Sequence, residues 1–396
     1  MADRVFLHVA STKSGTTFLQ RVLWAHRDQL LDQQVLLPGR AIGDHYRACI
    51  DVREEFSRLT DPGSAVGAWS RLVEEMAAWE GDALVSHELF APATSAQAAQ
   101  AIAMLGEAEV HVVVTARDLV RQIPAEWQEH LKHRSVLTFA EFVRELRTEP
   151  EHGPFSPNGY HFWHEQDLPE ISRRWGHAVP RQRVHVVTVP REGAAVDTLW
   201  SRFADLIGID GASFDLSKGR ANSSLLAEQA ELMRRLNLQL GSRLPLPGPY
   251  PETVKSLLAH QILSGRPGTR FGVVGEDRAF AIARAHTMVA ELRQLGVDVV
   301  GDLEELVPHE TGEEVSGDAQ VTAESVLAEA VEALAEVLDR VAVERTRRRR
   351  LREELDHARA EVGDLRARLG QAGAGGLSEF ATRVARRAHR RVRGRT

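Results

Sequence analysis

The sequence lacks the features of a secreted or membrane-spanning protein. Its only cysteine is Cys49, which excludes an intramolecular disulfide and fits a reducing compartment. No apolar run approaches the roughly 18 residues that a membrane-spanning helix needs. The first expected strand begins at Val5, which leaves no room for a signal peptide before it. These absences predict a soluble, cytoplasmic protein.

The body of the chain has a negative net charge, and lysine is rare throughout. Of the 49 basic residues, four are lysine and the other 45 are arginine, so a lysine is the more informative residue here. Residues 377–396 carry a net charge of +6 in a chain whose total is −7, so the other 376 residues carry −13. An acidic body with a basic tail argues against a nucleic-acid-binding core.

Continuous apolar runs rich in β-branched residues predict four buried strands. These strands are Val5–Val9, Leu84–Ser86, Val110–Thr115 and Val184–Val189. Segments with helical spacing lie between and after them, at Thr17–Trp24, Trp69–Trp79, Ala96–Leu105, Phe139–Leu146, Val196–Ile207, Leu225–Leu240, Thr253–Ile262 and Ala279–Leu295. A β-α-β-α order is typical of an α/β fold, in which a parallel sheet carries helices on both faces. Such sheets bind ligands at the carboxyl ends of their strands.

The turn after the first strand carries the strongest functional signal. It runs through Lys13-Ser14-Gly15-Thr16-Thr17 into an amphipathic helix. A short turn of this kind aims backbone N–H groups at one point, with the positive end of the helix dipole behind them. Lys13 adds a full charge, and the hydroxyls of Ser14, Thr16 and Thr17 can donate to phosphate oxygens. The alternative is an ordinary capped helix whose lysine is solvated.

The order Lys-Ser-Gly-Thr-Thr, followed by Phe18-Leu19-Gln20, resembles the 5'-phosphosulfate loop of sulfotransferases that use 3'-phosphoadenosine 5'-phosphosulfate (PAPS). The resemblance implies a P-loop-like fold, PAPS as the sulfuryl donor, and in-line transfer to a hydroxyl or amine of an unknown acceptor. The chain departs from the family pattern at Ala10 and Thr12, where glycine and proline are usual. Since alanine tolerates positive φ poorly, the loop is expected to be slightly rebuilt or to bind its anion less closely.

A second part of the resemblance lies at the end of the strand Val110–Thr115. There it implies that Arg117 holds the 3'-phosphate of the donor, a role for which a planar guanidinium is suited. The serine that the family places eight residues later falls on Ala125, so one hydroxyl is missing. The alternative is that Arg117 starts a helix and pairs with Asp118.

A third part is the segment Ser217-Lys218-Gly219-Arg220. It resembles a loop that closes over the donor in carbohydrate sulfotransferases. The resemblance implies that Lys218, Gly219 and Arg220 reach the phosphates. A Lys-Gly-Arg tripeptide is common, and the alternative is that it is merely solvated.

Sulfuryl transfer needs a base for the acceptor's proton, and the strand Leu84–Ser86 ends in His87 and Glu88. In the family the base is a histidine or glutamate near this strand end. Glu88 is our first candidate and His87 the second, because a desolvated carboxylate beside basic loops can be tuned toward neutral pH. Lys13 would neutralise the 5'-phosphate as the sulfuryl group leaves. The alternative is that Glu88 caps a helix and His87 packs.

No metal is expected. Two groups of residues with metal-ligating side chains occur, at His130, Lys132 and His133 and at His161, His164 and Glu165. Neither has the spacing of a zinc site.

Beyond residue 315, where we place the end of the α/β domain 1–315, the sequence changes character. Apolar residues follow two heptad seams, Leu327, Val331, Leu334, Leu338 and Val341, and then Leu351, Leu355, Ala358, Val362, Leu365 and Leu369. They predict a helical coiled coil over residues 320–369 that joins two copies of the chain. The ten-residue interval between the seams predicts a local stammer. The alternative is a long amphipathic helix packed on the body.

Residues 370–396 form a glycine-rich joint and a basic tail. The tail is either solvated or makes weak contact with an anionic membrane surface through Phe380 and Val384.

Two other functions stay open. Ala10 and Ala125 suggest a catalytically degenerate nucleotide-binding or scaffold protein of the same fold. A small-molecule kinase would need ATP and magnesium, and the absence of Gly-Lys-[Ser/Thr] argues against it. No motif identifies the acceptor, which can be a small molecule, a glycan or a lipid.

Overall fold

The computed structural model describes residues 2–148, 157–219, 224–308 and 321–371. Contacts divide the chain into two units, residues 1–330 and 331–396. The predicted end of the α/β domain near residue 315 and the predicted basic tail lie outside the described residues.

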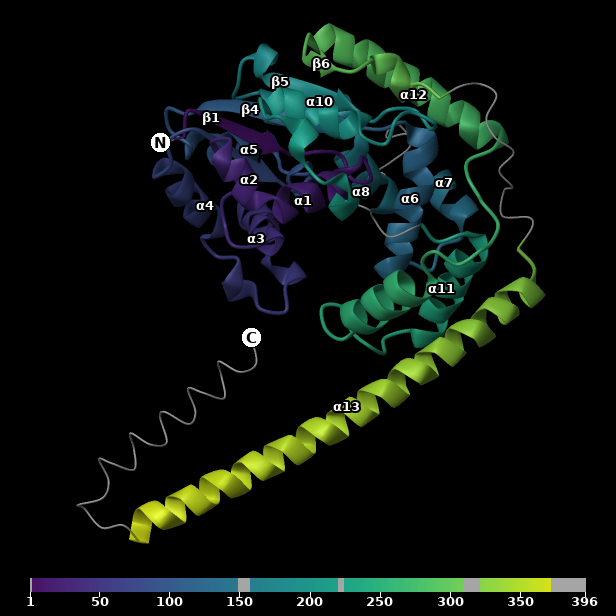
Figure 1. The fold of residues 1–396 in the computed structure, drawn as a ribbon. Helices are drawn as coiled ribbons and strands as arrows, with labels where there is room; N and C mark the ends of the chain where they lie inside the picture. Colours follow the sequence, from purple (N-terminus) through teal and green to yellow (C-terminus); the bar gives the residue numbers. More distant parts are fainter. Residues whose placement is uncertain (1, 149–156, 220–223, 309–320, 372–396) are drawn as a thin grey trace. The chain divides into compact units, whose positions relative to one another are not determined.

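A sheet of six parallel strands forms the centre of the first unit (Figure 1). The strands are β1 (Arg4–His8), β2 (Val35–Leu36), β3 (Asp82–Ser86), β4 (Glu109–Ala116), β5 (Val184–Thr188) and β6 (Asp298–Val300), in the order β2-β3-β1-β4-β5-β6. The four predicted strands are confirmed as β1, β3, β4 and β5. Sequence patterns missed β2 and β6, which are edge strands of two and three residues.

Helices cover both faces of the sheet and confirm the predicted α/β class. One face is packed by α1 (Thr16–Ala25), α2 (Arg27–Asp32) and α10 (Thr198–Ile207), whose side chains share a core with Phe6, Leu84, Val113 and Val187. On the other face α9 (Leu168–Gly176) contacts β4, and α5 (Ser95–Ala103) packs beside it. Further helices are α3 (Ile42–Arg53), α4 (Ala68–Ala77), α6 (Leu119–Lys132), α7 (Phe139–Leu146), α8 (Pro157–Gln166), α11 (Ala227–Leu240) and α12 (Gly275–Leu295). The helix predicted at Thr253–Ile262 is a π-helix, η8 (Pro251–Leu263).

The strand order places a crevice next to β1. From β1 the chain moves to β2 and β3 on one side and then returns to β4 on the other side of β1. At such a switch point the loops after the two central strands diverge and leave room for a ligand at the carboxyl ends. The loop after β1 contains Lys13, and the loop after β4 contains Arg117.

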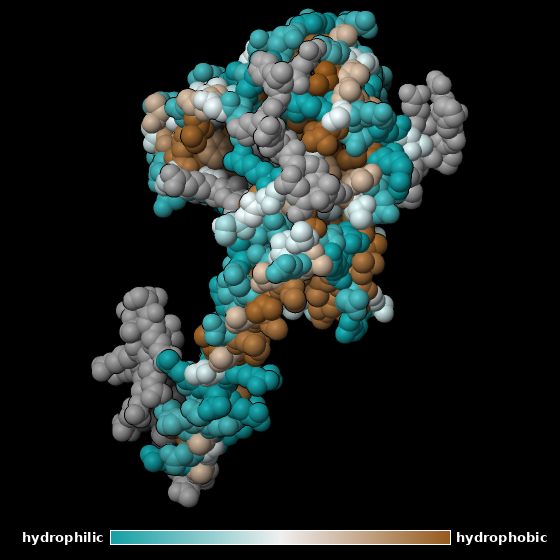
Figure 2. All heavy atoms as spheres, turned by 90° about the vertical axis from the view of Figure 1, so that its right-hand side faces the viewer, coloured by the Kyte–Doolittle hydropathy of each residue, from teal (hydrophilic) through white to brown (hydrophobic). Residues whose placement is uncertain are grey.

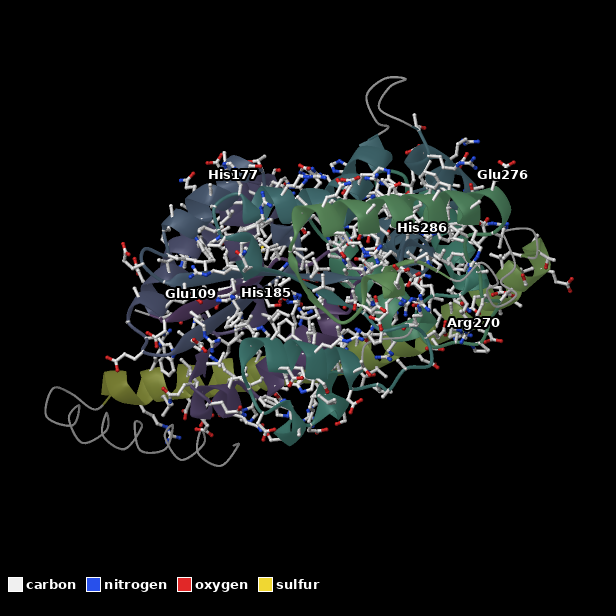
Figure 3. All side chains as sticks on the ribbon, turned by 90° about the horizontal axis from the view of Figure 1, so that it is seen from above. Glu109, His177, His185, Arg270, Glu276 and His286 are labelled. Carbon is white, nitrogen blue, oxygen red and sulfur yellow. The ribbon has the colours of Figure 1, made fainter. Side chains whose placement is uncertain are left out.

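At the opposite, amino edge of the sheet, a chain of polar side chains joins β4, β5 and β6 (Figure 3). His111 lies between Glu109 and His185, with N···O and N···N distances of 2.9 and 2.8 Å. His185 Nδ1 is in turn 2.7 Å from a carboxylate oxygen of Asp298. These hydrogen bonds link the starts of the three strands.

The second unit consists of most of α13 (Ala323–Gln371), a helix of 49 residues. It is continuous through the interval between the two predicted heptad seams. The apolar seam is exposed, with relative accessibilities of 59% for Val331, 58% for Leu334 and 59% for Leu338, and brown apolar side chains lie at its surface (Figure 2). None of the described helices is both long and apolar enough to cross a membrane.

We propose that this seam pairs with the seam of a second copy, because apolar heptads are buried when two such helices associate. Replacing Leu334 and Leu338 together by lysine puts two charges into that interface. Light scattering coupled to size exclusion should then show a dimer for the wild type and a monomer for the double variant. Asp339→Lys, on the outer side of the seam, should leave the dimer intact. A monomeric wild type contradicts the proposal.

Candidate functional site

A cavity of about 1180 Å³ lies at the carboxyl ends of β1, β3 and β4. Its described walls include the loop after β1, the residues that follow β3 and β4, one face of α6, and η8, together with residues of α1, α3 and α8. Seven residues predicted from sequence line it, namely Lys13, Gly15, Thr16, Thr17, His87, Glu88 and Arg117. Small-molecule sites typically measure roughly 300–1000 Å³, so this space has room for a nucleotide and a second molecule.

The loop after β1 turns sharply through three residues with positive φ. They are Ala10 at 44°, Lys13 at 59° and Gly15 at 86°. A side chain in this region costs about 1–2 kcal/mol, which glycine avoids. The sequence predicted that the loop would be rebuilt to spare Ala10 a positive φ, or would bind its anion less closely. Ala10 instead has a positive φ itself, so the backbone is not rebuilt at this residue. Gly15 is required for a second reason, since a Cβ there would lie 2.5 Å from Leu199 Cδ2.

The backbone of this loop presents free hydrogen-bond donors. Among the described residues, the N–H groups from Lys13 to Thr17 have no acceptor, and the Gly15 N-cap of α1 has no side-chain cap. The positive end of the α1 dipole lies behind them. Free N–H groups at a helix N-terminus are a type of backbone that can bind an oxyanion, and residues 13–17 are called the cradle below.

The Ser14 hydroxyl does not face the cradle. It is buried and bonds to the Ser11 carbonyl at 2.5 Å and to Thr115 Oγ1 at 2.6 Å. The prediction that this hydroxyl donates to phosphate needs correction, because it ties the loop to β4. The backbone N–H of Ser14 is the group that the cradle can use.

Arg117 braces the cradle and faces the cavity. Its Nη1 donates to the Lys13 carbonyl at 3.2 Å, and its buried Nε has no partner among the described residues. Burial and the charge of Arg121 lower the pKa of Arg117 to about 10. Asp118 caps α6 and binds Arg121, so the alternative pairing of Asp118 with Arg117 is absent. Ala125 lines the cavity two turns further along α6.

The predicted basic loop lies against α1. Ser217–Gly219 belongs to a 3-10 helix, Leu216–Gly219, and a Cβ on Gly219 would lie 2.5 Å from Phe18 Cδ2. Gly219 therefore serves close packing. Lys218 is exposed and lies outside the cavity lining, and Arg220 lies outside the described residues.

His87 and Glu88 differ in their capacity to act as a base. His87 Nδ1 accepts the N–H of Leu89 at 3.1 Å, so the neutral ring carries its proton on Nε2 and has no free lone pair. Glu88 Oε2 accepts from Gln20 Nε2 at 3.0 Å. Burial opposes ionisation of Glu88, but His87, Gln20 and Lys13 together hold its pKa below the usual value. The prediction that Glu88 is tuned toward neutral pH is thus wrong in direction.

Three acidic residues of the cavity were not predicted as site residues, and Glu165 was weighed only in the rejected metal group with His161 and His164. Glu126 and Glu129 come from α6, and Glu165 comes from α8. Burial and the neighbouring Glu126 raise the pKa of Glu165 to about 7. The spacing of Glu126 and Glu129 places both on one helix face, and this pattern in the sequence indicates a shared acidic surface. No sequence pattern places Glu165 in the cavity, because its position depends on how α8 packs.

Lys13 points to Glu129 across the cavity. The Nζ–Oε2 distance is 2.7 Å. Burial disfavours the ammonium, but the carboxylates of Glu129, Glu126 and Glu88 outweigh it and raise the pKa of Lys13. Lys13 is therefore charged at neutral pH.

Two of the cavity histidines lie near carboxylates. His130 lies 3.7 Å from Glu126, and His133 lies 3.2 Å from Glu129. Within the ranges that the structure describes, no group of three or more His, Cys, Asp and Glu side chains is arranged to hold a metal ion.

Comparisons with known proteins give one structural likeness. No protein-family model matches the chain, and no curated protein matches it. Among solved structures, the fold is similar to that of a sulfotransferase from Alicyclobacillus acidocaldarius, with 16% identity, 75% of this chain and 97% of that chain covered, and a TM-score of 0.40. These values are too low to assign a function, so the assignment below is argued from the site.

The raised pKa of Glu165 predicts a pH-dependent effect of replacing it. A carboxyl group whose pKa is higher in the folded chain than in the unfolded chain, where it is about 4.3, lowers the stability as the pH rises from the unfolded pKa to the folded pKa, and the loss is complete above the folded pKa. Glu165→Gln removes that loss. The variant should gain more stability over the wild type at about pH 8 than at about pH 5, measured by urea unfolding. Glu74→Gln, an exposed change on α4, is the control, and an equal difference at both pH values contradicts the assignment.

Proposed function

We propose that the chain transfers a sulfuryl group from PAPS to a hydroxyl or amine of an acceptor molecule. The observation that carries this proposal is the cradle of free N–H groups from Lys13 to Thr17, with a charged lysine and with Arg117 beside it. A donor with two anionic groups fits a site that combines the cradle, a charged lysine and Arg117. Its 5'-phosphosulfate would take the cradle, and its 3'-phosphate would take the guanidinium of Arg117, which lines the cavity.

The order of residues in the loop favours this donor over a nucleoside triphosphate. A triphosphate P-loop has its lysine after the last glycine and then a Ser or Thr that holds magnesium. Here Lys13 precedes Gly15, and two threonines follow. The kinase alternative therefore lacks the residue order that it needs.

The chemistry needs little beyond positioning and charge. The acceptor oxygen or nitrogen forms a bond to sulfur as the bond between sulfur and the bridging phosphate oxygen breaks, and the bond electrons stay on that oxygen. Lys13 and the cradle N–H groups stabilise the negative charge that develops there. The acceptor's proton passes to a base. By analogy with phosphoryl transfer, alignment of the reacting groups supplies much of the rate.

Glu88 is the base that the geometry favours. Its low pKa keeps it ionised at neutral pH, so a lone pair is available. His87 has its Nδ1 lone pair occupied by the Leu89 N–H and a pKa that burial lowers. His87 is then a donor through Nε2 and not a base.

Two variants separate binding from turnover. Lys13→Ala should weaken binding of adenosine 3',5'-bisphosphate about tenfold or more, because a charge-assisted contact is lost, and turnover with it. Glu88→Gln should keep the nucleotide affinity and lose turnover. Calorimetry measures the first effect, and mass spectrometry of acceptor mixtures incubated with PAPS measures the second. A Lys13→Ala variant with normal binding and turnover contradicts the proposal, whereas nucleotide binding by the wild type without turnover of any acceptor supports the degenerate-scaffold alternative.

Ala125→Ser tests the orientation of the donor. If the 3'-phosphate lies between Arg117 and α6, a hydroxyl at position 125 adds one hydrogen bond, worth about 1 kcal/mol, and should tighten adenosine 3',5'-bisphosphate several-fold. Binding of adenosine 5'-monophosphate should not change. Ala125→Cys, of similar size but with a weak donor, is the control. Equal affinities for the serine and cysteine variants place the 3'-phosphate elsewhere.

A further inference from the structure

Three of the four lysines in the chain meet at one carboxylate in the cavity. Glu129 Oε2 lies 2.7 Å from Lys13 Nζ and 3.7 Å from Lys132 Nζ, and Oε1 lies 2.6 Å from Lys255 Nζ. The lysines come from the loop after β1, the last turn of α6 and η8. In a sequence with 49 basic residues, 45 of them arginine, this convergence is not expected from composition.

The cluster is largely shielded from solvent. Relative side-chain exposures are 28% for Lys13, 12% for Lys132, 29% for Lys255 and 19% for Glu129. Burial opposes ionisation of Glu129, but the three lysines and His133 hold its pKa well below the usual value. Glu129 is therefore a permanent anion, enclosed by ammonium groups.

The cluster holds more positive than negative charge. Glu129 neutralises one of three ammonium groups, and the next acid, Glu126, accepts from Thr12 Oγ1 and lies near His130. Burial lowers the pKa of Lys132, and the charges of Lys13 and Lys255 lower it further. Buried like charges without enough counter-ions are costly. A single lysine paired with Glu129 would link these segments without the cost of like charges. A purely structural role therefore does not explain why three lysines meet here.

We propose that Lys13, Lys132 and Lys255 form a binding site for a doubly charged phosphate or sulfate group of a ligand, and that Glu129 fills this site when the ligand is absent. Once Glu129 is displaced, the ammonium groups are left without their counter-charge, which a phosphate monoester with a charge of about −1.5 to −2 supplies. Lysines that approach from three chain segments suit a tetrahedral group with several acceptor oxygens. This inference rests on the proposed function for the ligand that brings the group.

The site is separate from the position that the resemblance gives to the 3'-phosphate. Lys132 lies seven residues beyond Ala125 on the same face of α6, which is about 10 Å along the helix. The doubly charged group is then either the 3'-phosphate of a donor that reaches further along α6, or an anionic group of the acceptor. Both share the same chemistry, and binding measurements distinguish them.

The test compares Lys132→Met and Lys255→Met, which keep the apolar stems, with Glu129→Gln and with Arg40→Met as a control far out in solvent. Calorimetry with inorganic phosphate, adenosine 5'-monophosphate and adenosine 3',5'-bisphosphate gives the affinities. The lysine variants should bind inorganic phosphate about tenfold or more weakly, and Glu129→Gln should bind it more tightly, because it removes the competing carboxylate. Thermal unfolding shows that each variant is folded.

Comparing the three ligands shows which molecule carries the doubly charged group. If it is the 3'-phosphate, the lysine variants lose the advantage of the bisphosphate over the monophosphate. If the group belongs to the acceptor, the lysine variants still bind the bisphosphate more tightly than the monophosphate. Inorganic phosphate then no longer binds to lysine variants that are loaded with the bisphosphate. A wild type that binds inorganic phosphate but neither nucleotide leaves this site intact and rejects the proposed function. Wild-type affinities in the lysine variants, weaker phosphate binding by Glu129→Gln, or no phosphate binding by the wild type overturn the inference.

Discussion

The unpaired N–H groups between Lys13 and Thr17 are the constraint on which the site depends. Backbone donors without acceptors are normally avoided in a folded chain, and here they occur together at the start of α1, where the strand order opens a crevice beside β1. Buried contacts hold them there, since Ser14 is tied to β4 and Arg117 holds the Lys13 carbonyl. The fold thus stabilises a loop whose own hydrogen bonds are incomplete, and a bound oxyanion would complete them.

Charge in the cavity follows from this arrangement. A cradle that attracts anions needs a counter-charge when it is empty, and α6 supplies Glu126 and Glu129 on the face that it turns to Lys13. The two acids are used differently. Glu126 bonds to Thr12 and so fixes the loop, while Glu129 contacts the lysines. One helix therefore both positions the cradle and balances its charge.

The sequence was sufficient to predict those parts of the fold and the site that depend on neighbouring residues in the chain. Buried parallel strands are continuous apolar runs, so β1, β3, β4 and β5 were recognisable, and residues at their carboxyl ends, such as Lys13 and Arg117, were placed at one sheet edge by topology alone. The short strands β2 and β6 carry no such signal. Lys255 and Glu165 reach the cavity only through the packing of η8 and α8, which periodicity does not specify. The pKa of Glu88 is lowered first by the neighbouring His87 and further by Gln20, a partner 68 residues away in sequence that no local pattern identifies.

The two carboxyl groups with opposite pKa shifts divide the chemistry of the cavity between them. Glu88 is held ionised by His87, Gln20 and Lys13, whereas burial and Glu126 hold Glu165 partly protonated near pH 7. Environments that push the pKa values of two acids apart are typical of sites where one group accepts a proton and the other donates a hydrogen bond. An acceptor hydroxyl placed between them would give its proton to Glu88 and could receive a hydrogen bond from Glu165. Under the proposed function, the acceptor would take the side of the cavity lined by the end of β3 and by α8, and the donor would take the side lined by the cradle and α6.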